Sequence, residues 1–265
     1  MKLEKCTSWH YQLQGTVNPP ETADLVVVDI DCDQDPKELA KRKSNIPRKV
    51  VAYLSIGEAE DYRAYWPQIN ERKDSNPIVI AENPEWKGNY AVKFWDDAWQ
   101  LLIIKRALEA QARGFTGLYL DKADVYQDIA EKYPHEDAPE RRQQMVTFIK
   151  NICTAVPDMD VILQNAPELL TSQEVYSLVA GCGVEDLAYG EEETGRRNSM
   201  HSTNWRSDAF KTTGLPVFVV EYLDKDDVDK QQVARRVSHH LGFVLTIEAQ
   251  DRALDGHPVA YFTKP

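Results

Sequence analysis

The chain has 265 residues, 42% of them hydrophobic, and carries a formal net charge of −12 with a pI near 5.0. No apolar run approaches the roughly 18 residues that would suggest a membrane span. The acidic balance argues against nucleic-acid or anionic membrane partners and is compatible with a cationic substrate, although acidity also simply favours solubility. Without repeats or linkers, residues 1–265 are expected to form a single domain with a sizeable core.

The four cysteines (Cys6, Cys32, Cys153 and Cys182) show no CxxC spacing. The sequence therefore indicates neither a zinc knuckle nor a CxxC redox motif, and four cysteines in so long a chain leave room for one disulfide at an unspecified pairing. The N-terminal stretch MKLEKCTSWHYQLQG lacks the apolar core of a secretory signal. A cytoplasmic protein and a mature chain whose leader has been removed both fit this N-terminus.

Strand-like segments recur along the chain. The runs LVVVDID and KVVAYLSIGE are continuously apolar and end in acid, as strands covered on both faces do. We expect eight strands, at residues 9–15, 25–31, 49–58, 117–124, 160–165, 183–190, 216–224 and 243–250.

Helical patterns separate many of these strands. Residues 96–114 begin with an Asp cap, carry a broad apolar stripe and end at Gly114. Further helices are expected at residues 137–156, 172–181 and 226–242. The Trp- and Pro-rich stretch from Asp61 to Tyr90 predicts an irregular, elaborated loop after the third strand, with a short helix near DYRAYWPQI.

Eight strands alternating with helices predict an α/β protein with a (β/α)₈ TIM-barrel fold. A doubly wound open sheet is the alternative. However, no GxGxxG or Walker-type loop follows any of the strands, so the sequence gives no sign of a nucleotide cofactor. We expect no cofactor.

The active site of such a barrel lies at the C-terminal ends of its strands. In this chain the strands end in acid or amide side chains nearly all round the barrel. A single acid at such a position most often caps the next helix. A ring of carboxylates costs stability through repulsion and desolvation, so it points to chemistry, cation binding or a polar polymeric ligand. The candidates are Gln12, Gln14, Asp29, Asp31, Ser55, Glu58, Asp121, Asp124, Gln164, Asn165, Glu185, Asp186, Glu221, Tyr222 and Glu248.

Two carboxylates can cleave a glycosidic bond, because one protonates the leaving oxygen while the other attacks the anomeric carbon or activates water. Neighbouring acids assist by separating the two pKa values. Aromatic side chains in the loops would stack on sugar rings, although each taken alone is more often a core residue. The candidates are Tyr62, Tyr65, Trp66, Trp86, Trp95, Tyr126 and Tyr189.

Other site classes fit the sequence poorly. The segment that begins at Asp29 has alternating acids, but Gln34 and Ala40 replace the Gly and Glu that a calcium loop requires. His239 and His240 are adjacent on a helical pattern and cannot both face one metal ion. No GxSxG motif marks a serine hydrolase. We therefore expect no metal site, and a metal-dependent hydrolase that uses the acid ring is only a weaker alternative.

Six motifs occur in order across most of the chain: WHYQLQG, VVVDID, VAYLSIGEAEDYRAYW, GFTGLYLDKADVY, LQNAPELL and GVEDLAYG. Together they closely resemble glycoside hydrolase family 114, the endo-α-1,4-polygalactosaminidase-like barrels. The resemblance runs from about Trp9 to Tyr222. It implies a (β/α)₈ fold, a secreted or periplasmic location and hydrolysis of α-1,4-linked galactosamine polymers. Such a polymer is cationic when deacetylated and suits the acidic chain.

The resemblance also implies residue roles. Asp121 would be the nucleophile and Glu185 the general acid/base, while Asp186 is the alternative to Glu185 because side chains alternate along a strand. The expected substrate-binding residues are Gln12, Asp29, Glu58, Trp95, Asp124, Asn165, Tyr189, Glu221 and Tyr222. An alternative of another class is a barrel that binds carbohydrate without cleaving it, as part of a polysaccharide assembly or surface system.

Overall fold

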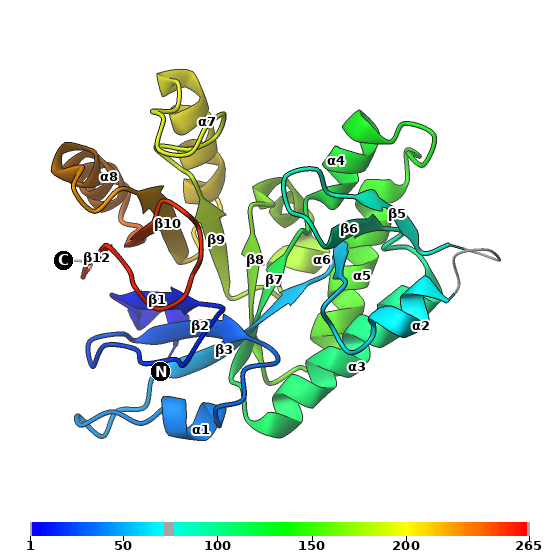
Figure 1. Ribbon diagram of the computed structural model, residues 1–265, viewed down its shortest axis with the longest axis horizontal. Helices are drawn as coiled ribbons and strands as arrows, with labels where there is room; N and C mark the ends of the chain where they lie inside the picture. Colours follow the sequence, from blue (N-terminus) through cyan, green and yellow to red (C-terminus); the bar gives the residue numbers. More distant parts are fainter. Residues whose placement is uncertain (1, 72–76, 264–265) are drawn as a thin grey trace.

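The computed structural model describes residues 2–71 and 77–263. Eight parallel strands form the predicted (β/α)₈ barrel, with the helices arranged around it (Figure 1). In their order around the barrel these strands are β1 (Trp9–Gln12), β2 (Leu25–Asp29), β3 (Lys49–Ser55), β7 (Gly117–Asp121), β8 (Asp160–Gln164), β9 (Gly181–Glu185), β10 (Val217–Leu223) and β11 (Val244–Ala249).

The seam between β1 and β11 is closed by the C-terminal segment. The two strands are neighbours without a hydrogen-bonded ladder between them in the described part of the chain. Instead, the short strand β12 (Ala260–Tyr261) pairs antiparallel with β11, and the Tyr261 hydroxyl bonds the His10 ring. The carbonyl oxygen of Leu254 also accepts hydrogen bonds from the backbone of Leu13 and Gln14, at 2.8 and 3.0 Å. The barrel is therefore nearly closed.

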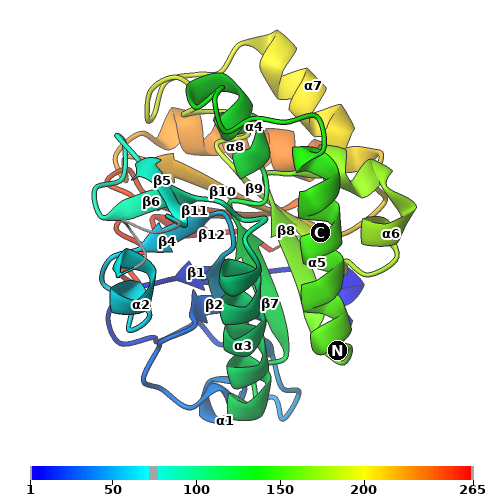
Figure 2. The same cartoon turned by 90° about the vertical axis from the view of Figure 1, so that its right-hand side faces the viewer.

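The longest helix is the one with the clearest capping signals in the sequence. It is α3. The Asp96 side chain accepts hydrogen bonds from the first-turn amides of Ala98 and Trp99, and the helix ends at Gly114, which is left-handed. Figure 2 shows α3 and α5 side by side over one flank of the barrel. The described helices are α1 (Pro36–Leu39), α2 (Trp66–Asn70), α3 (Asp97–Arg113), α4 (Val125–Lys132), α5 (Arg141–Ala155), α6 (Gln173–Tyr176), α7 (Met200–Lys211) and α8 (Val228–Leu241), with 3₁₀ turns at Leu3–Lys5 and Pro167–Thr171. Within the described residues, none has both the length and the apolar character of a transmembrane helix.

Several boundaries differ from the sequence prediction. The helix expected from residue 137 begins at Arg141, and the one expected over 172–181 ends at Tyr176, because Gly181 already belongs to β9. The last part of the strand expected at 183–190 is a turn, in which Asp186 has a positive φ of 54°. Helices α4 and α7 were not predicted. Helix α4 has only eight residues, too few to show a sustained apolar period, and the apolar residues of α7 are few and do not form a regular stripe.

The loop after β3 is more regular than predicted. It contains a three-stranded antiparallel sheet made of β4 (Glu58–Glu60), β6 (Asn89–Val92) and β5 (Val79–Glu82), in that order, together with α2. Figures 1 and 2 show this small sheet beside the barrel. Strands of three or four residues are too short to show an alternating pattern, which explains why the sequence suggested an irregular loop.

The barrel interior is unusually aromatic. Trp9 and Tyr11 stack with ring centroids 5.5 Å apart, and Tyr119 lies 5.5 Å from Tyr11. This packing needs a glycine on β9, because a Cβ at Gly183 would lie 2.0 Å from the Tyr119 hydroxyl oxygen. Rigid aromatic packing beneath the strand ends gives the polar residues above it a fixed platform.

Candidate active site

A cleft of about 830 Å³ lies over the C-terminal ends of the barrel strands. Its walls come from strand ends, the loop after β2, the small sheet and the segment at Arg252–Leu254. Ten of the strand-end residues expected from the sequence line it: Gln12, Gln14, Asp29, Asp31, Glu58, Asp121, Asp124, Asn165, Glu185 and Tyr222. The structure therefore brings most of the predicted set into one cavity.

Asp121 ends β7 and is oriented by two donors. The Tyr53 hydroxyl donates to Oδ2 at 2.6 Å, and the backbone N–H of Lys122 donates to Oδ1 at 2.7 Å. Burial, followed by the charge of Asp121, holds the pKa of Tyr53 well above its ordinary value, so its hydroxyl remains a donor. Both contacts suit an ionised carboxylate, which can only accept hydrogen bonds.

Glu185 ends β9, which is separated from β7 by β8 alone. The Tyr222 hydroxyl donates to Oε1 at 2.5 Å, and the Gln164 amide donates to Oε2. Burial, and then the negative charge of Asp121, raise the pKa of Glu185 to about 7. Two neighbouring carboxylates with different environments are the arrangement that separates an acid from a nucleophile.

Asp186 is turned away from the cleft. Its Oδ2 pairs with Arg252 at 2.6 Å, and it is absent from the described cavity lining. The backbone oxygens of Glu185 and Asp186 accept from the Arg206 guanidinium at 2.7 and 2.6 Å. Of the two adjacent acids that the sequence left open, the structure places Glu185 beside Asp121.

A second group of charges lies next to Asp121. The Lys122 ammonium contacts Glu58 at 3.1 Å and Asp128 at 3.5 Å, while Asn83 donates to Glu58 at 2.9 Å. Asp124 is half-buried, and burial raises the pKa of its carboxyl to about 7 despite the opposing effect of Lys122. This part of the cleft therefore contains a protonatable carboxyl and a fixed cation.

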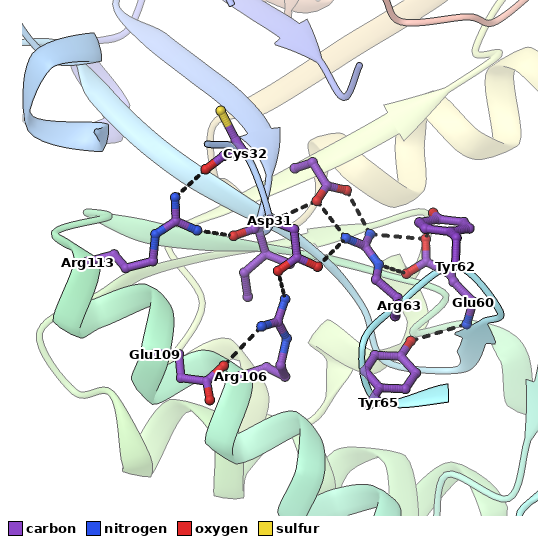
Figure 3. Close-up of polar contacts among 11 residues, drawn as sticks. Asp31, Cys32, Glu60, Tyr62, Arg63, Tyr65, Arg106, Glu109 and Arg113 are labelled. Carbon is purple, nitrogen blue, oxygen red and sulfur yellow. Dashed lines mark hydrogen bonds and ion pairs between the residues drawn. The ribbon is translucent and has the colours of Figure 1, made fainter. Parts of the chain in front are cut away.

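Arg63 is the centre of a buried ion-pair cluster at the cleft wall (Figure 3). Its guanidinium contacts Asp29 through two nitrogens, at 2.6 and 2.7 Å, Asp31 at 2.9 Å and Glu60 at 2.7 Å. Arg106 on α3 extends the cluster to Asp31. Asp29 thus lines the cleft, but both its oxygens are engaged by an arginine.

Three residues expected to bind sugar lie outside the described lining of the cleft. Trp95 packs beneath the Arg141 guanidinium, 3.4 Å from the ring centroid. Tyr189 is 4% exposed and packs in the core. Glu221 accepts from the backbone N–H groups of Ala188 and Tyr189, at 2.7 and 3.1 Å, which holds the turn after β9.

Strand alternation explains the position of Glu221. Val220 and Tyr222 point into the barrel, whereas Glu221 shares the outer face of β10 with Val219 and Leu223. The sequence prediction treated Glu221 and Tyr222 as equivalent strand-end residues. Only one of two consecutive strand residues can face the interior.

The cleft also contains residues outside the predicted set, namely Tyr53, Lys122 and Arg252. Of the loop aromatics considered for sugar stacking, Tyr62 and Trp86 are among its described lining residues. Alternation from Val51 through Tyr53 to Ser55 offered a signal for Tyr53, and Lys122 directly follows Asp121. Arg252 had no signal, because it follows the last barrel strand in a loop and lies over the Tyr222 ring at 4.2 Å only through the fold.

Glu248 on β11 is buried at 2% exposure and lies outside the described cleft lining. Within the described residues, the Thr246 hydroxyl donates to its carboxyl at 3.4 Å. Burial raises its pKa to about 8. Because the folded state favours the neutral form, stability is fully present below the ordinary pKa near 4.5 and is lost as pH rises toward 8. Glu248→Gln should therefore raise the free energy of unfolding by on the order of 3 kcal/mol at pH 7 and by almost nothing at pH 4.

Urea unfolding of both proteins at pH 4, 7 and 8.5 measures this effect. The surface variant Glu174→Gln is the control, because this residue pairs with Lys150 in solvent. A gain for Glu248→Gln that is the same at every pH would contradict the explanation by titration.

Other chemistry-bearing side chains are dispersed. All four cysteines are free, so no disulfide forms in the structure. Within residues 2–71 and 77–263, no three His, Cys, Asp or Glu side chains are grouped so as to hold a metal ion.

Comparison with known proteins shows the family of the chain. The model of glycoside-hydrolase family GH114 matches residues 1–261. An uncharacterized protein of Methanocaldococcus jannaschii is 32% identical over 268 residues, which cover 93% of this chain and 77% of that protein. An uncharacterized protein of Deinococcus radiodurans is also 32% identical, over 88% of this chain and 78% of its own length.

Solved structures share the fold. The glycoside hydrolase domain of PelA from Pseudomonas aeruginosa superposes with a TM-score of 0.74 at 20% identity, covering 96% of this chain and 97% of that domain. Ega3 of Aspergillus fumigatus, solved in complex with galactosamine, gives a TM-score of 0.72 at 18% identity over 95% of this chain and 94% of its own. At these identities the likeness supports the barrel architecture.

Proposed function

Because the chain belongs to glycoside-hydrolase family GH114, we propose that it cleaves α-1,4-linked galactosamine-containing polysaccharide at internal linkages. The observation that carries the reaction is the pairing of Asp121 with Glu185 in one cleft, where the pKa of Glu185 is raised to about 7. At neutral pH a substantial fraction of Glu185 is protonated, as a general acid must be.

The reaction follows from the two environments. Glu185 donates its proton to the glycosidic oxygen as the bond to the leaving chain breaks. The Asp121 carboxylate, held by Tyr53 and the Lys122 amide, attacks the anomeric carbon and forms a glycosyl ester. The ionised Glu185 then removes a proton from water, which hydrolyses the ester and regenerates Asp121. This double displacement retains the anomeric configuration.

The charge of the cleft supports an amine-bearing substrate. Eight carboxylates and four basic side chains are among its described lining residues. The acids are Asp29, Asp31, Asp33, Glu58, Glu60, Asp121, Asp124 and Glu185. A cleft of this sign raises the local concentration of a polycation, and the effect weakens with added salt. That Ega3 was solved with galactosamine supports the same sugar class.

The length and openness required of an endo-acting enzyme also fit. The cleft is lined from the loop after β1 to the small sheet and is larger than a pocket for one sugar. Internal cleavage requires that substrate sugars extend on either side of the reacting bond, so the first products should be oligosaccharides rather than monomers.

The test is reducing-end release from partly deacetylated α-1,4-galactosaminoglycan, with product lengths followed by mass spectrometry. We expect early release of oligosaccharides, slower cleavage of the fully N-acetylated polymer and a rate that falls with ionic strength. The α-1,4-linked polymer of galacturonic acid is the matched anionic control and should not be cut. Equal, salt-independent cleavage of the acetylated polymer would contradict the proposed role of charge. Binding without any cleavage would instead favour a non-catalytic carbohydrate-binding barrel.

A further inference from the structure

Two aromatic side chains in the cleft are exposed and have no part in the reaction described above. Tyr62 is 66% exposed and Trp86 is 46% exposed, and both line the cavity. Tyr62 follows β4, and Trp86 lies in the turn between β5 and β6. In the described contacts neither one bonds or stacks with Asp121 or Glu185. Inside a cavity, two such rings offer a ligand broad apolar faces with a polar edge.

The Tyr62 ring is held in place before any ligand binds. Its hydroxyl donates to the Glu60 carboxylate, and the Arg63 guanidinium carbon lies 5.0 Å from the ring centroid (Figure 3). Arg63 and Glu60 are themselves buried and paired at 2.7 Å. A ring fixed in this way loses little conformational freedom on binding, which favours affinity.

Trp86 belongs to the same rigid unit. In its turn, Asn89 donates a backbone hydrogen bond to the Trp86 carbonyl at 3.0 Å, and Gly88 donates to the Glu82 carboxylate at 2.9 Å. The Asp61 amide, next to Tyr62, donates to the Gly88 carbonyl at 2.9 Å. Gly88 has a positive φ of 87°, a backbone conformation that glycine adopts without strain, so this turn favours glycine.

We propose that Tyr62 and Trp86 form an additional sugar-binding subsite, on which a pyranose ring of the polysaccharide packs its apolar C–H face. This inference rests on the proposed function, since it concerns the same substrate. The polar groups that sugars need are alongside, because Asp31, Lys87 and Asn89 also line the cavity. An amino sugar is suited further by the attraction between a cation and an aromatic face.

The subsite makes substrate binding asymmetric. The ends of β2 and β3 and the small sheet contribute many of the residues that line the cleft. Residues 187–216 contribute none of its described lining. A polysaccharide therefore gains its extra contacts on the small-sheet side of Asp121 and Glu185. Long substrates should benefit from Tyr62 and Trp86, while a substrate that occupies only the sugar site beside the carboxylates should not.

The experiment compares Tyr62→Ala and Trp86→Ala with the wild type on two substrates: the partly deacetylated polymer and a nitrophenyl galactosaminide with a single sugar. For each variant we expect KM for the polymer to rise by about tenfold, with kcat little changed and unchanged kinetics on the small glycoside. Tyr62→Phe keeps the ring and should retain most of the affinity. Equal losses on both substrates would overturn the subsite, because a distorted active site produces that pattern.

Matched controls come from exposed aromatics outside the described cleft lining. Tyr176→Ala and Trp205→Ala remove side chains that are 38% and 55% exposed, and both should behave as the wild type. Direct binding of the intact polymer, measured by isothermal titration calorimetry, separates this inference from the proposed function. If the wild type binds without cleaving, weaker binding by the two Ala variants still supports the subsite while the reaction is refuted. Binding by these variants equal to that of the wild type, or no binding by the wild type, overturns the subsite.

Discussion

Glu185→Gln is expected to lower kcat on the polysaccharide by about 10²–10⁴-fold, since an amide has no acidic proton to give to the leaving oxygen. The replacement is nearly isosteric, so the Tyr222 hydroxyl can still donate to the side-chain oxygen. Asp121→Asn should lose at least as much, because the amide is a poor nucleophile and no glycosyl ester forms. Both rates come from reducing-end release, with folding checked by circular dichroism.

The two roles are separated by the leaving group. The dinitrophenolate group of a dinitrophenyl galactosaminide leaves without being protonated. With this substrate Glu185→Gln should therefore still form the glycosyl ester in a rapid burst and then stall. Asp121→Asn should show no burst. Azide, which attacks the ester without a general base, should restore turnover only to the Glu185 variant. A burst in both variants, or in neither, would contradict the assignment of nucleophile and acid.

The pH profile gives an independent readout. Glu185 acts in its protonated form, and its pKa is raised to about 7. For the wild type, kcat/KM on the polymer should fall tenfold per pH unit above this value as the proton is lost. The alkaline limb should disappear in Glu185→Gln. Asp186→Asn is the matched control, because Asp186 itself lies outside the described cleft lining and pairs with Arg252. Its charge helps to raise the pKa of Glu185, so its loss should move the limb to lower pH without removing it. A limb lost only in Asp186→Asn would move the role to that residue.

The barrel could be predicted from the sequence because its strands are long apolar runs with polar ends. That pattern also located Asp121 and Glu185, which are the last residues of β7 and β9 and line the same cleft. The apolar run of a strand and the polar residue at its end each depend on a few consecutive residues, so the local sequence is sufficient to predict them. The family resemblance is confirmed by the match over residues 1–261, while the roles of the two carboxylates stay predictions.

The rest of the site depends on contacts that a linear pattern does not contain. Tyr189 was expected at a strand end, but its backbone N–H is taken by the Glu221 carboxylate and its ring packs in the core. Trp95 was expected in the cleft and lies instead beneath Arg141, which is distant in sequence. Tyr62 and Trp86 were two of seven loop aromatics considered for sugar stacking, and the sequence did not distinguish them from the rest; the small sheet and its flanking loops place them at the cleft.

Arg63→Met is expected to reduce the free energy of unfolding by about 3–5 kcal/mol, because it leaves buried carboxylates without their counter-ion. The side chains of Arg63, Glu60 and Asp29 are 4%, 6% and 17% exposed, so little solvent is available to replace the lost pairing. Arg106→Met is the matched control. Its partners Asp31 and Glu109 are 47% and 42% exposed, and the cost should stay within about 1 kcal/mol.

Urea unfolding of the two single variants and of the double variant Arg63→Met/Glu60→Gln tests this account. If the unpaired charge is the cause, neutralising Glu60 should recover part of the lost stability, although it removes one more hydrogen-bond acceptor. Equal losses in Arg63→Met and Arg106→Met would instead mean that the cluster is effectively solvated. The same cluster joins the end of β2 to the small sheet through Asp29 and Glu60. Its loss should therefore also free the Tyr62 ring, so that the polymer KM rises in Arg63→Met but not in Arg106→Met.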